Sequence, residues 1–248
     1  MSNDPGASPL VLAADTSSPR ASLALARGGR LLAALGGESR DRHSRTFFAH
    51  LDLLLGVAGV TTSEINLFAV VTGPGSFTGL RVGLAAVKGL ARARGREAVG
   101  VTALEVWALT AGVSGTVVAL LAAGRGEIYG GLSEVAADGS LRRVAPDEVG
   151  RPDQVCARLL AAMGTRPAVV VGDAAEDSVA HIERVAGPGR VSLAGVVDRA
   201  ASGWQLKADL PLLAPYLALH AGRLLGRGRA AGPRPYYLRP TDVEVPRE

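Results

Sequence analysis

Residues 67–94, LFAVVTGPGSFTGLRVGLAAVKGLARAR, decide the fold of this chain. They begin with Leu67–Val71, a short apolar run rich in Val and Phe that predicts a buried strand. Gly73-Pro74-Gly75 ends the strand. The hydroxyls of Ser76-Phe77-Thr78 can then cap a helix that ends near Arg94. A strand, a glycine turn and a helix in this order predict an α/β unit that aims main-chain N–H groups above a sheet.

The glycine turn matches neither of two common phosphate-binding motifs. A P-loop requires G-x-x-x-x-G-K-[ST], whereas Gly79 follows Gly73 by six residues and precedes no Lys. The dinucleotide fingerprint G-x-G-x-x-G fits Gly73 and Gly75, but Thr78 occupies its third glycine position. Nucleotide binding therefore remains open here, and the spacing favours a tight structural turn.

The helix after the turn carries small residues on one face. Gly79, Gly83, Ala86 and Leu90 lie three or four residues apart, and glycines inside a helix cost about 1 kcal/mol each relative to Ala. Such a stripe indicates the close approach of another backbone. That backbone is either the chain's own sheet or a helix of another subunit.

Composition predicts a globular protein with an ample core. The chain has 248 residues, of which 48% are hydrophobic, a net charge of +4 and a single cysteine, Cys156. This excludes a disulfide framework and a cysteine metal site, and the mild charge does not indicate a nucleic-acid patch. The N-terminus lacks the basic region of a signal peptide, and no segment is long and apolar enough for a membrane span. We expect a cytoplasmic protein.

The order of predicted elements occurs twice along the chain. Each half runs through three strands, a helix, a strand and a helix, and the small residues of 111–115 form the best boundary. We therefore predict a duplicated α/β fold with an N-terminal lobe over residues 1–112 and a C-terminal lobe over residues 113–248. The last long helix is expected within 204–226, and the Pro-rich tail from Gly232 is expected to dock partly on the body or on a partner because it is apolar.

Few residues offer chemistry. Asp15-Thr16-Ser17 closes the first strand and could hold a magnesium ion or a phosphate, although the same residue types readily form a hydrogen-bonded turn. His43 and His50 are separated by about 10.5 Å of helix rise, which is too far for one metal ion. Metal-binding helical histidines sit four residues apart, and Phe47 occupies that position. We expect no metal site, no cofactor and no catalytic residue.

Several segments together resemble the TsaB family, a non-catalytic component of the bacterial machinery that makes threonylcarbamoyladenosine in tRNA. They span residues 12 to 240 in the expected order. The segments are LAADTSSPRASLAL, the His43-Ser44 pair, TGPGSFTGLRVGLAAVKGLA, VGVTALEVWA, GRGEIYGG and PYYLRP.

The resemblance implies a two-lobed actin-like (ASKHA) fold, in agreement with the duplicated pattern. It also implies that the chain serves as a scaffold for its catalytic paralogue TsaD, which transfers a threonylcarbamoyl group to the adenosine beside the anticodon. The ATPase TsaE is expected to join the two proteins. Contact with tRNA is expected to be only indirect, and the sequence leaves open whether the chain alone is a monomer or a homodimer through the same helices. TsaD-like proteins carry a metal-binding histidine pair, which Phe47 interrupts here.

The predicted partner surface combines the first long helix with the glycine helix. It consists of His43, Phe47, Leu51, Leu54, Gly79, Gly83, Ala86 and Leu90. The alternative function is an actin-like ATPase or sugar kinase, in which Asp15 and Thr16 would hold metal and phosphate, with Ser17 as a further weak candidate. A metal-dependent endopeptidase is disfavoured by the missing histidine pair.

Overall fold

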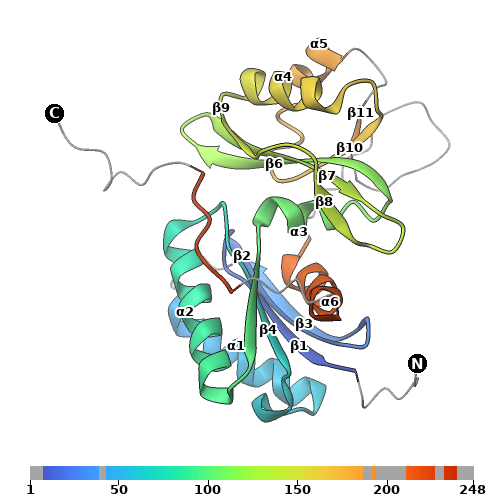
Figure 1. Cartoon of the computed structure of the whole chain (residues 1–248). Helices are drawn as coiled ribbons and strands as arrows, with labels where there is room; N and C mark the ends of the chain where they lie inside the picture. Colours follow the sequence, from blue (N-terminus) through green and yellow to red (C-terminus); the bar gives the residue numbers. More distant parts are fainter. Residues whose placement is uncertain (1–7, 39–42, 187–190, 194–210, 227–231, 239–248) are drawn as a thin grey trace. The chain divides into compact units, whose positions relative to one another are not determined.

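The computed structural model of the chain describes residues 8–38, 43–186, 191–193, 211–226 and 232–238 (Figure 1). It contains two compact units. The first comprises Met1–Val106 with Leu212–Tyr236, and the second comprises Trp107–Pro211 with Tyr237–Glu248. The division assigned from sequence, 1–112 and 113–248, differs because residues 212–236 return to the first unit. Ser22 shows the reason, since its Oγ accepts a hydrogen bond of 3.1 Å from the Ala214 N–H.

A five-stranded sheet forms the centre of the first unit. Its strands are β1 (Leu10–Asp15), β2 (Arg20–Arg27), β3 (Arg30–Glu38), β4 (Leu67–Val71) and β5 (Glu97–Val101), in the order β3-β2-β1-β4-β5. The first three are antiparallel, and β4 and β5 run parallel to β1. Gly28 and Gly29 join β2 to β3 with φ of 58° and 78°, as a tight hairpin turn requires.

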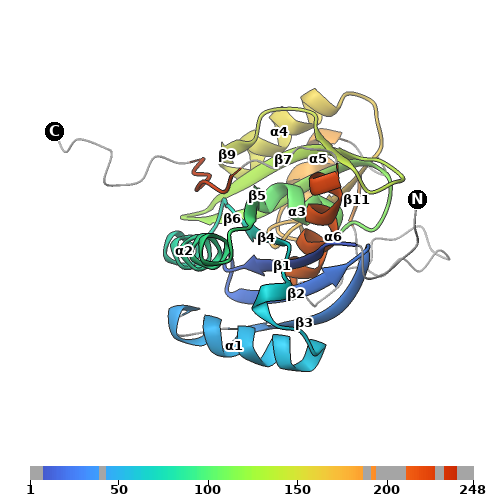
Figure 2. The ribbon, with the colours of Figure 1, turned by 60° about the horizontal axis from the view of Figure 1, so that its bottom comes forward.

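Helices cover both faces of this sheet. On one face lie α1 (His43–Ala58) and α2 (Phe77–Arg94), and on the other lies α6 (Leu213–Gly226) (Figure 2). Alternate residues of β1 point to opposite faces, so Leu10 and Leu12 enter the core beneath α1 and α2, whereas Val11 faces α6 near Gly222. A 3-10 turn, Thr62–Glu64, follows α1 and has a capping box formed by Thr61 and Glu64.

The second unit contains a six-stranded sheet. Its path is β11-β10-β6-β7-β8, and β9 pairs with β7. The elements are β6 (Gly115–Gly124), β7 (Glu127–Val135), β8 (Leu141–Arg143), β9 (Glu148–Gly150), α4 (Pro152–Met163), β10 (Ala168–Val171), α5 (Val179–Ala186) and β11 (Val191–Leu193). A short helix, α3 (Ala103–Leu109), precedes β6. One apolar core lies between α4, α5 and the sheet and includes Cys156, as a small core residue.

Most predicted elements are present at their predicted positions. The strand β9 was not predicted, because a segment of three residues is too short to show the alternation of apolar and polar residues that indicates a strand. The helix α5 begins at Val179, after a turn in which the Ser178 hydroxyl donates to the Ala174 carbonyl. The helix expected within 204–226 is present as α6, and residues 204–210 lie outside the described chain. Among the described helices, none combines the length and the hydrophobicity that a bilayer span needs.

Candidate partner interface

The turn after β1 fastens the sheet to the start of α2. Asp15, Thr16 and Ser17 are all buried. The Thr16 hydroxyl donates to the Gly79 carbonyl at 2.7 Å, and the Ser76 N–H donates to the Ser17 carbonyl at 2.7 Å. Ser76 is also the N-cap of α2, because its hydroxyl accepts from the Gly79 N–H. This turn and the start of α2 therefore form one hydrogen-bonded unit.

Glycines permit this close approach. A Cβ at Gly79 would overlap the Thr16 carbonyl oxygen, and a Cβ at Gly83 would overlap the Thr16 hydroxyl. Gly75 would meet the Ser17 carbonyl in the same way, and its φ of 157° lies at the edge of the region that favours glycine. The two glycines of the stripe therefore face the turn that follows the chain's own first strand, and the chain's own sheet was the open alternative to a partner helix.

Asp15 is enclosed by its own turn. Its Oδ1 accepts from the Ser17 N–H at 2.8 Å and from the Ser17 hydroxyl at 2.6 Å. Its Oδ2 is buried and has no hydrogen-bond partner among the described residues. Burial raises the pKa of this carboxyl from 3.8 to about 6, although the Ser17 hydrogen bonds act to lower it. Asp15, Thr16 and Ser17 thus use most of their polar atoms within the chain, as a structural turn would.

The pKa of Asp15 fixes how its ionisation affects stability. The folded carboxyl keeps its proton up to about pH 6, whereas the ordinary carboxyl loses it near pH 3.8. Stability is therefore lost as pH rises through this window, because the folded protein must then bury a charge. At about 1.36 kcal/mol per pH unit, the loss is on the order of 3 kcal/mol.

The large apolar residues predicted for the partner surface belong to the core. Phe47, Leu51 and Leu54 are at most 4% exposed and pack with the residues of β1, β2 and α2. Ala86 and Leu90 are half-buried against the same cluster. These side chains position the two helices and do not themselves form their outer surface. His43 is the first residue of α1, and its side chain lies outside what the structure describes.

The outward side of α1 is nevertheless apolar. Leu53 and Val57, four residues apart on one side of the helix, are 55% and 73% exposed, and Phe48, 52% exposed, lies on the opposite flank. On α2, the small residues Ala85, Gly89 and Ala93 are exposed. We call Leu53, Val57, Ala85, Gly89 and Ala93 the outer face. Large exposed apolar side chains gathered on neighbouring elements are typical of protein–protein contacts.

Sequence reasoning could have found the outer face of α1. Its apolar residues surround almost the whole helix, as the adjacent pairs Phe47-Phe48 and Leu53-Leu54 show. A helix with one buried side needs only a stripe. The exposed member of each pair, Phe48 in the first and Leu53 in the second, was therefore the signal for a further contact.

The described residues show no cluster of metal-ligating side chains. No group of three His, Cys, Asp or Glu residues is arranged to hold a metal ion there. Phe47 is buried in the core, so the position that a metal-binding pair would use is occupied by a packing residue.

The C-terminal tail docks on the first unit, as predicted. Pro233 is buried against Gly100, and the Tyr236 N–H donates to the Thr72 carbonyl at 2.9 Å. A Cβ at Gly73 would lie 2.7 Å from the Tyr236 carbonyl oxygen. The tail is therefore in direct contact with the glycine turn that precedes α2.

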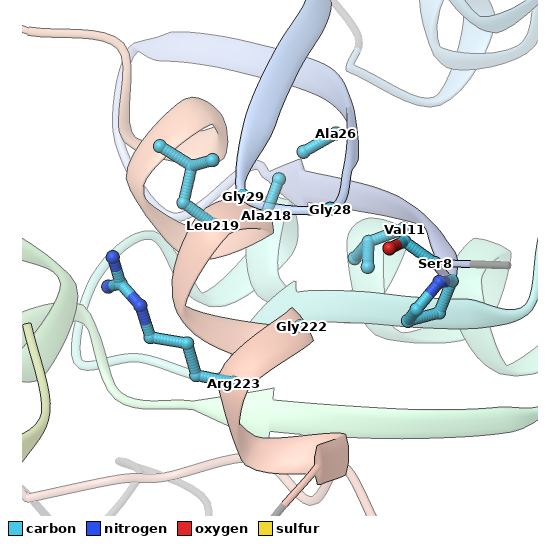
Figure 3. Close-up of a pocket in the computed structure, with 10 residues that line it drawn as sticks. Ser8, Val11, Ala26, Gly28, Gly29, Ala218, Leu219, Gly222 and Arg223 are labelled. Carbon is cyan, nitrogen blue, oxygen red and sulfur yellow. The ribbon is translucent and has the colours of Figure 1, made fainter. Parts of the chain in front are cut away.

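One hollow of about 180 Å³ lies on the other side of the first sheet (Figure 3). It is bounded by the hairpin glycines Gly28 and Gly29 and by Ala218, Gly222 and Arg223 of α6. None of the residues predicted for a site lines it, and it contains no carboxylate or histidine.

Comparison with known proteins connects this arrangement to tRNA modification. The family model of TsaD, tRNA N6-adenosine threonylcarbamoyltransferase, matches residues 37–158. The tRNA threonylcarbamoyladenosine biosynthesis protein TsaB of Bacillus subtilis is 30% identical over 139 residues, which cover 56% of this chain and 60% of that protein. The TsaB protein of Escherichia coli is 32% identical over 122 residues, covering 48% of this chain and 52% of its own.

A threonylcarbamoyltransferase is also similar. The enzyme of Nitratidesulfovibrio vulgaris is 36% identical over 119 residues, covering 42% of this chain and 33% of the enzyme. The chain thus spans between a third and three fifths of the length of these curated relatives. The solved structure of YeaZ from Pseudomonas aeruginosa superposes with a TM-score of 0.74 at 26% identity, covering 93% of this chain and all of YeaZ.

The two sheets, their shared order of strands and the superposition with YeaZ define an α/β protein of the two-lobed actin-like class. This confirms the predicted fold class. Within that class, the chain is similar to the relatives named TsaB and to the YeaZ structure.

Proposed function

We propose that this chain is a non-catalytic subunit that binds a TsaD-type threonylcarbamoyltransferase through the outer face of α1 and α2. The observation that carries the proposal is the exposure of Leu53 and Val57 on a helix whose other side is already buried in the core. The names of the relatives supply the pathway, which is formation of threonylcarbamoyladenosine in tRNA. The ATPase TsaE belongs to the same proposed assembly.

The buried residues of the predicted surface have a supporting role in this proposal. Phe47 and Leu51 hold α1 on the sheet, and Gly79 and Gly83 set α2 close to β1. Both helices then present their outward sides to a partner. Two helices of the enzyme packed on them would bury roughly 1,600 Å² in total, which is a standard interface.

A non-catalytic role fits the turn after β1. A phosphate-binding or metal-binding turn needs open ligands, whereas Thr16 and Ser17 are bonded within the chain and Asp15 is fully buried. We expect no ATP hydrolysis and no threonylcarbamoyl transfer by the protein alone. Magnesium-dependent ATP turnover that Asp15→Ala abolishes would instead establish the ATPase alternative.

The interface is tested by co-expression with the threonylcarbamoyltransferase of the same organism and size-exclusion chromatography. Leu53→Asp places a charge in the outer face and is expected to abolish co-elution. Leu31→Asp is the matched control, because Leu31 of β3 is also exposed, at 40% against 55% for Leu53. Thermal melting of each variant checks the fold. Co-elution of Leu53→Asp at wild-type affinity would refute the proposed interface.

A further inference from the structure

The hollow beside α6 lies at the start of β1, whereas the glycine turn follows the end of the parallel strand β4. Ala218 and Gly222 of α6 contribute to its lining. Figure 3 shows Arg223 on one side of α6, and Ser8 and Val11 on the other. The hollow is therefore on the face of the first sheet that α6 covers, away from the outer face of α1 and α2.

Gly222 leaves this hollow open although the packing around it does not require a glycine. A Cβ at Gly222 would lie 3.7 Å from its nearest heavy atom, Cγ2 of Val11, which is an ordinary van der Waals contact. At Gly79, in contrast, the same carbon would overlap the Thr16 carbonyl oxygen. Glycine inside a helix is less favourable than alanine, so α6 forgoes stability at this position. The missing side chain leaves space in the hollow instead of admitting another main chain.

The lining of the hollow is mostly aliphatic. Of the ten described residues that line it, only Ser8 and Arg223 have polar side chains. A bound water needs several polar partners, and this lining provides few. Small-molecule sites combine an apolar lining with a small number of polar groups that orient the ligand. The hollow therefore suits an apolar group that carries one polar end.

Arg223 determines the charge that the polar end should carry. It is exposed and lies in the last turn of α6. No acidic side chain is among the described lining residues, so none of them repels an anion. A guanidinium carries five N–H donors, and two of them match the two oxygens of a carboxylate. A carboxylate is therefore the polar end that this lining favours.

The volume of the hollow limits the apolar group. A dry cavity of about 150 Å³ holds one benzene molecule, and the hollow measures about 180 Å³. It therefore matches a single six-membered ring or a branched aliphatic group of similar size. Pockets for larger ligands measure about 300–1,000 Å³, so this hollow does not enclose a nucleotide.

We propose that this hollow binds a small organic carboxylate, whose ring or branched aliphatic group lies against Ala218 and Gly222 and whose carboxylate pairs with Arg223. The inference does not rest on the proposed function, because no lining residue belongs to the outer face or to the turn after β1. Both parts of the ligand contribute to binding. A ring without the carboxylate forms no ion pair, and a carboxylate without the ring leaves the hollow unfilled.

The test titrates the full chain with three probes at constant ionic strength and follows binding by NMR chemical shifts. Benzoate has both the ring and the carboxylate, benzyl alcohol has the ring without the charge, and acetate has the carboxylate without the ring. Benzoate should bind at least about tenfold more tightly than benzyl alcohol, because only benzoate forms charge-assisted hydrogen bonds. Acetate should show no saturable binding over the same range of concentration.

The variant Gly222→Val tests the space in the hollow. Its side chain would occupy part of the volume that the ring needs, so benzoate should bind at least about tenfold more weakly. Gly56→Val is the matched control, because Gly56 is an exposed glycine of α1 whose Cβ would meet no atom within 4 Å. This control should bind benzoate as wild type does. Thermal melting of both variants checks the fold.

The variant Arg223→Gln tests the charge and leaves the space unchanged. Benzoate should then bind no more tightly than benzyl alcohol, whereas the affinity for benzyl alcohol should stay at the wild-type value. Arg142→Gln is the matched control, since it removes the same charge from an exposed position on β8. Because Arg223 is exposed, this variant also tests the site if Gly222→Val does not fold.

Three results would overturn the inference. In the first, benzoate shows no saturable binding to wild type. In the second, benzoate binds, but Gly222→Val and Arg223→Gln bind it as their controls do, which would place it elsewhere on the protein. In the third, benzoate binds only after residues 1–7 are deleted, which would make the segment before Ser8 the occupant of the hollow. The proposed function would stand in all three cases, because it depends on co-elution with the enzyme.

Discussion

Three glycines of α2 offer a test of how the helix packs. Gly79 lies against the main chain of Thr16, whereas a Cβ at Gly89 would meet no atom within 4 Å. Both positions are inside the same helix, so replacement by Ala brings the same gain in helix propensity, about 1 kcal/mol. The difference between Gly79→Ala and Gly89→Ala therefore isolates the steric conflict with β1.

The magnitude follows from the atom that blocks the methyl group. At Gly79 it is the Thr16 carbonyl oxygen, which cannot turn away as a side chain could. Overpacking usually costs about 1–3 kcal/mol, and we take the upper end. After the gain in propensity, Gly79→Ala should lose about 2 kcal/mol, whereas Gly89→Ala should gain up to about 1 kcal/mol.

Gly83→Ala should fall between these two variants. Its methyl group would displace the Thr16 hydroxyl, which can rotate but then loses its bond to the Gly79 carbonyl. A hydrogen bond of this kind contributes about 1 kcal/mol, which the gain in propensity offsets. The expected net change is therefore close to zero.

Thermal and urea unfolding of the free protein measure all three variants. At about 2–4 °C per kcal/mol for a chain of this size, Gly79→Ala should melt roughly 4–8 °C below wild type. The reasoning would be refuted if Gly79→Ala and Gly89→Ala were equally stable, because α2 would then not approach β1 as closely as the glycines indicate.

Two further predictions concern the turn and the tail. Asp15→Asn removes the buried charge, so the melting temperature of this variant should change less between pH 5 and pH 7 than that of wild type. This range includes the Asp15 pKa of about 6. Parallel curves of melting temperature against pH would show that Asp15 does not titrate there. The Tyr236 amide is bonded to Thr72, so it should exchange hydrogen more slowly than the exposed Arg234 amide in mass spectrometry, and equally fast exchange at both would contradict the docked tail.

The elements of the first unit could be predicted because their signals are local. The apolar run Leu67–Val71, the Ser76 cap and the Gly28-Gly29 turn each act through neighbours in sequence, and each is present as predicted. The repeated order of strands and helices likewise revealed two sheets. The return of α6 to the first sheet could not be predicted, because helix periodicity gives the buried side of a helix but not the sheet that it covers.

The direction in which α2 faces was also beyond the sequence. A stripe of small residues indicates the approach of a backbone, but a partner helix and a strand of the same chain require the same residues. The deciding fact is the position of Thr16, which is 63 residues from Gly79 along the chain. On α1, in contrast, Phe47, which was assigned to the partner surface, lies on the buried side of the helix with Leu51 and Leu54.

The side of α2 on which a residue lies determines whether a substitution there affects stability or association. Gly79 and Gly83 touch Thr16 in the turn after β1, so substitutions there act on the folding of the free protein. Ala85 and Gly89 point outward, and Lys88 lies beside them, so changes there should leave the fold intact and alter association. Residues only two or three positions apart therefore act on different equilibria. A substitution on this helix is best interpreted from its place in the helical turn. The three glycines show that residue type alone does not determine whether a substitution changes folding or association.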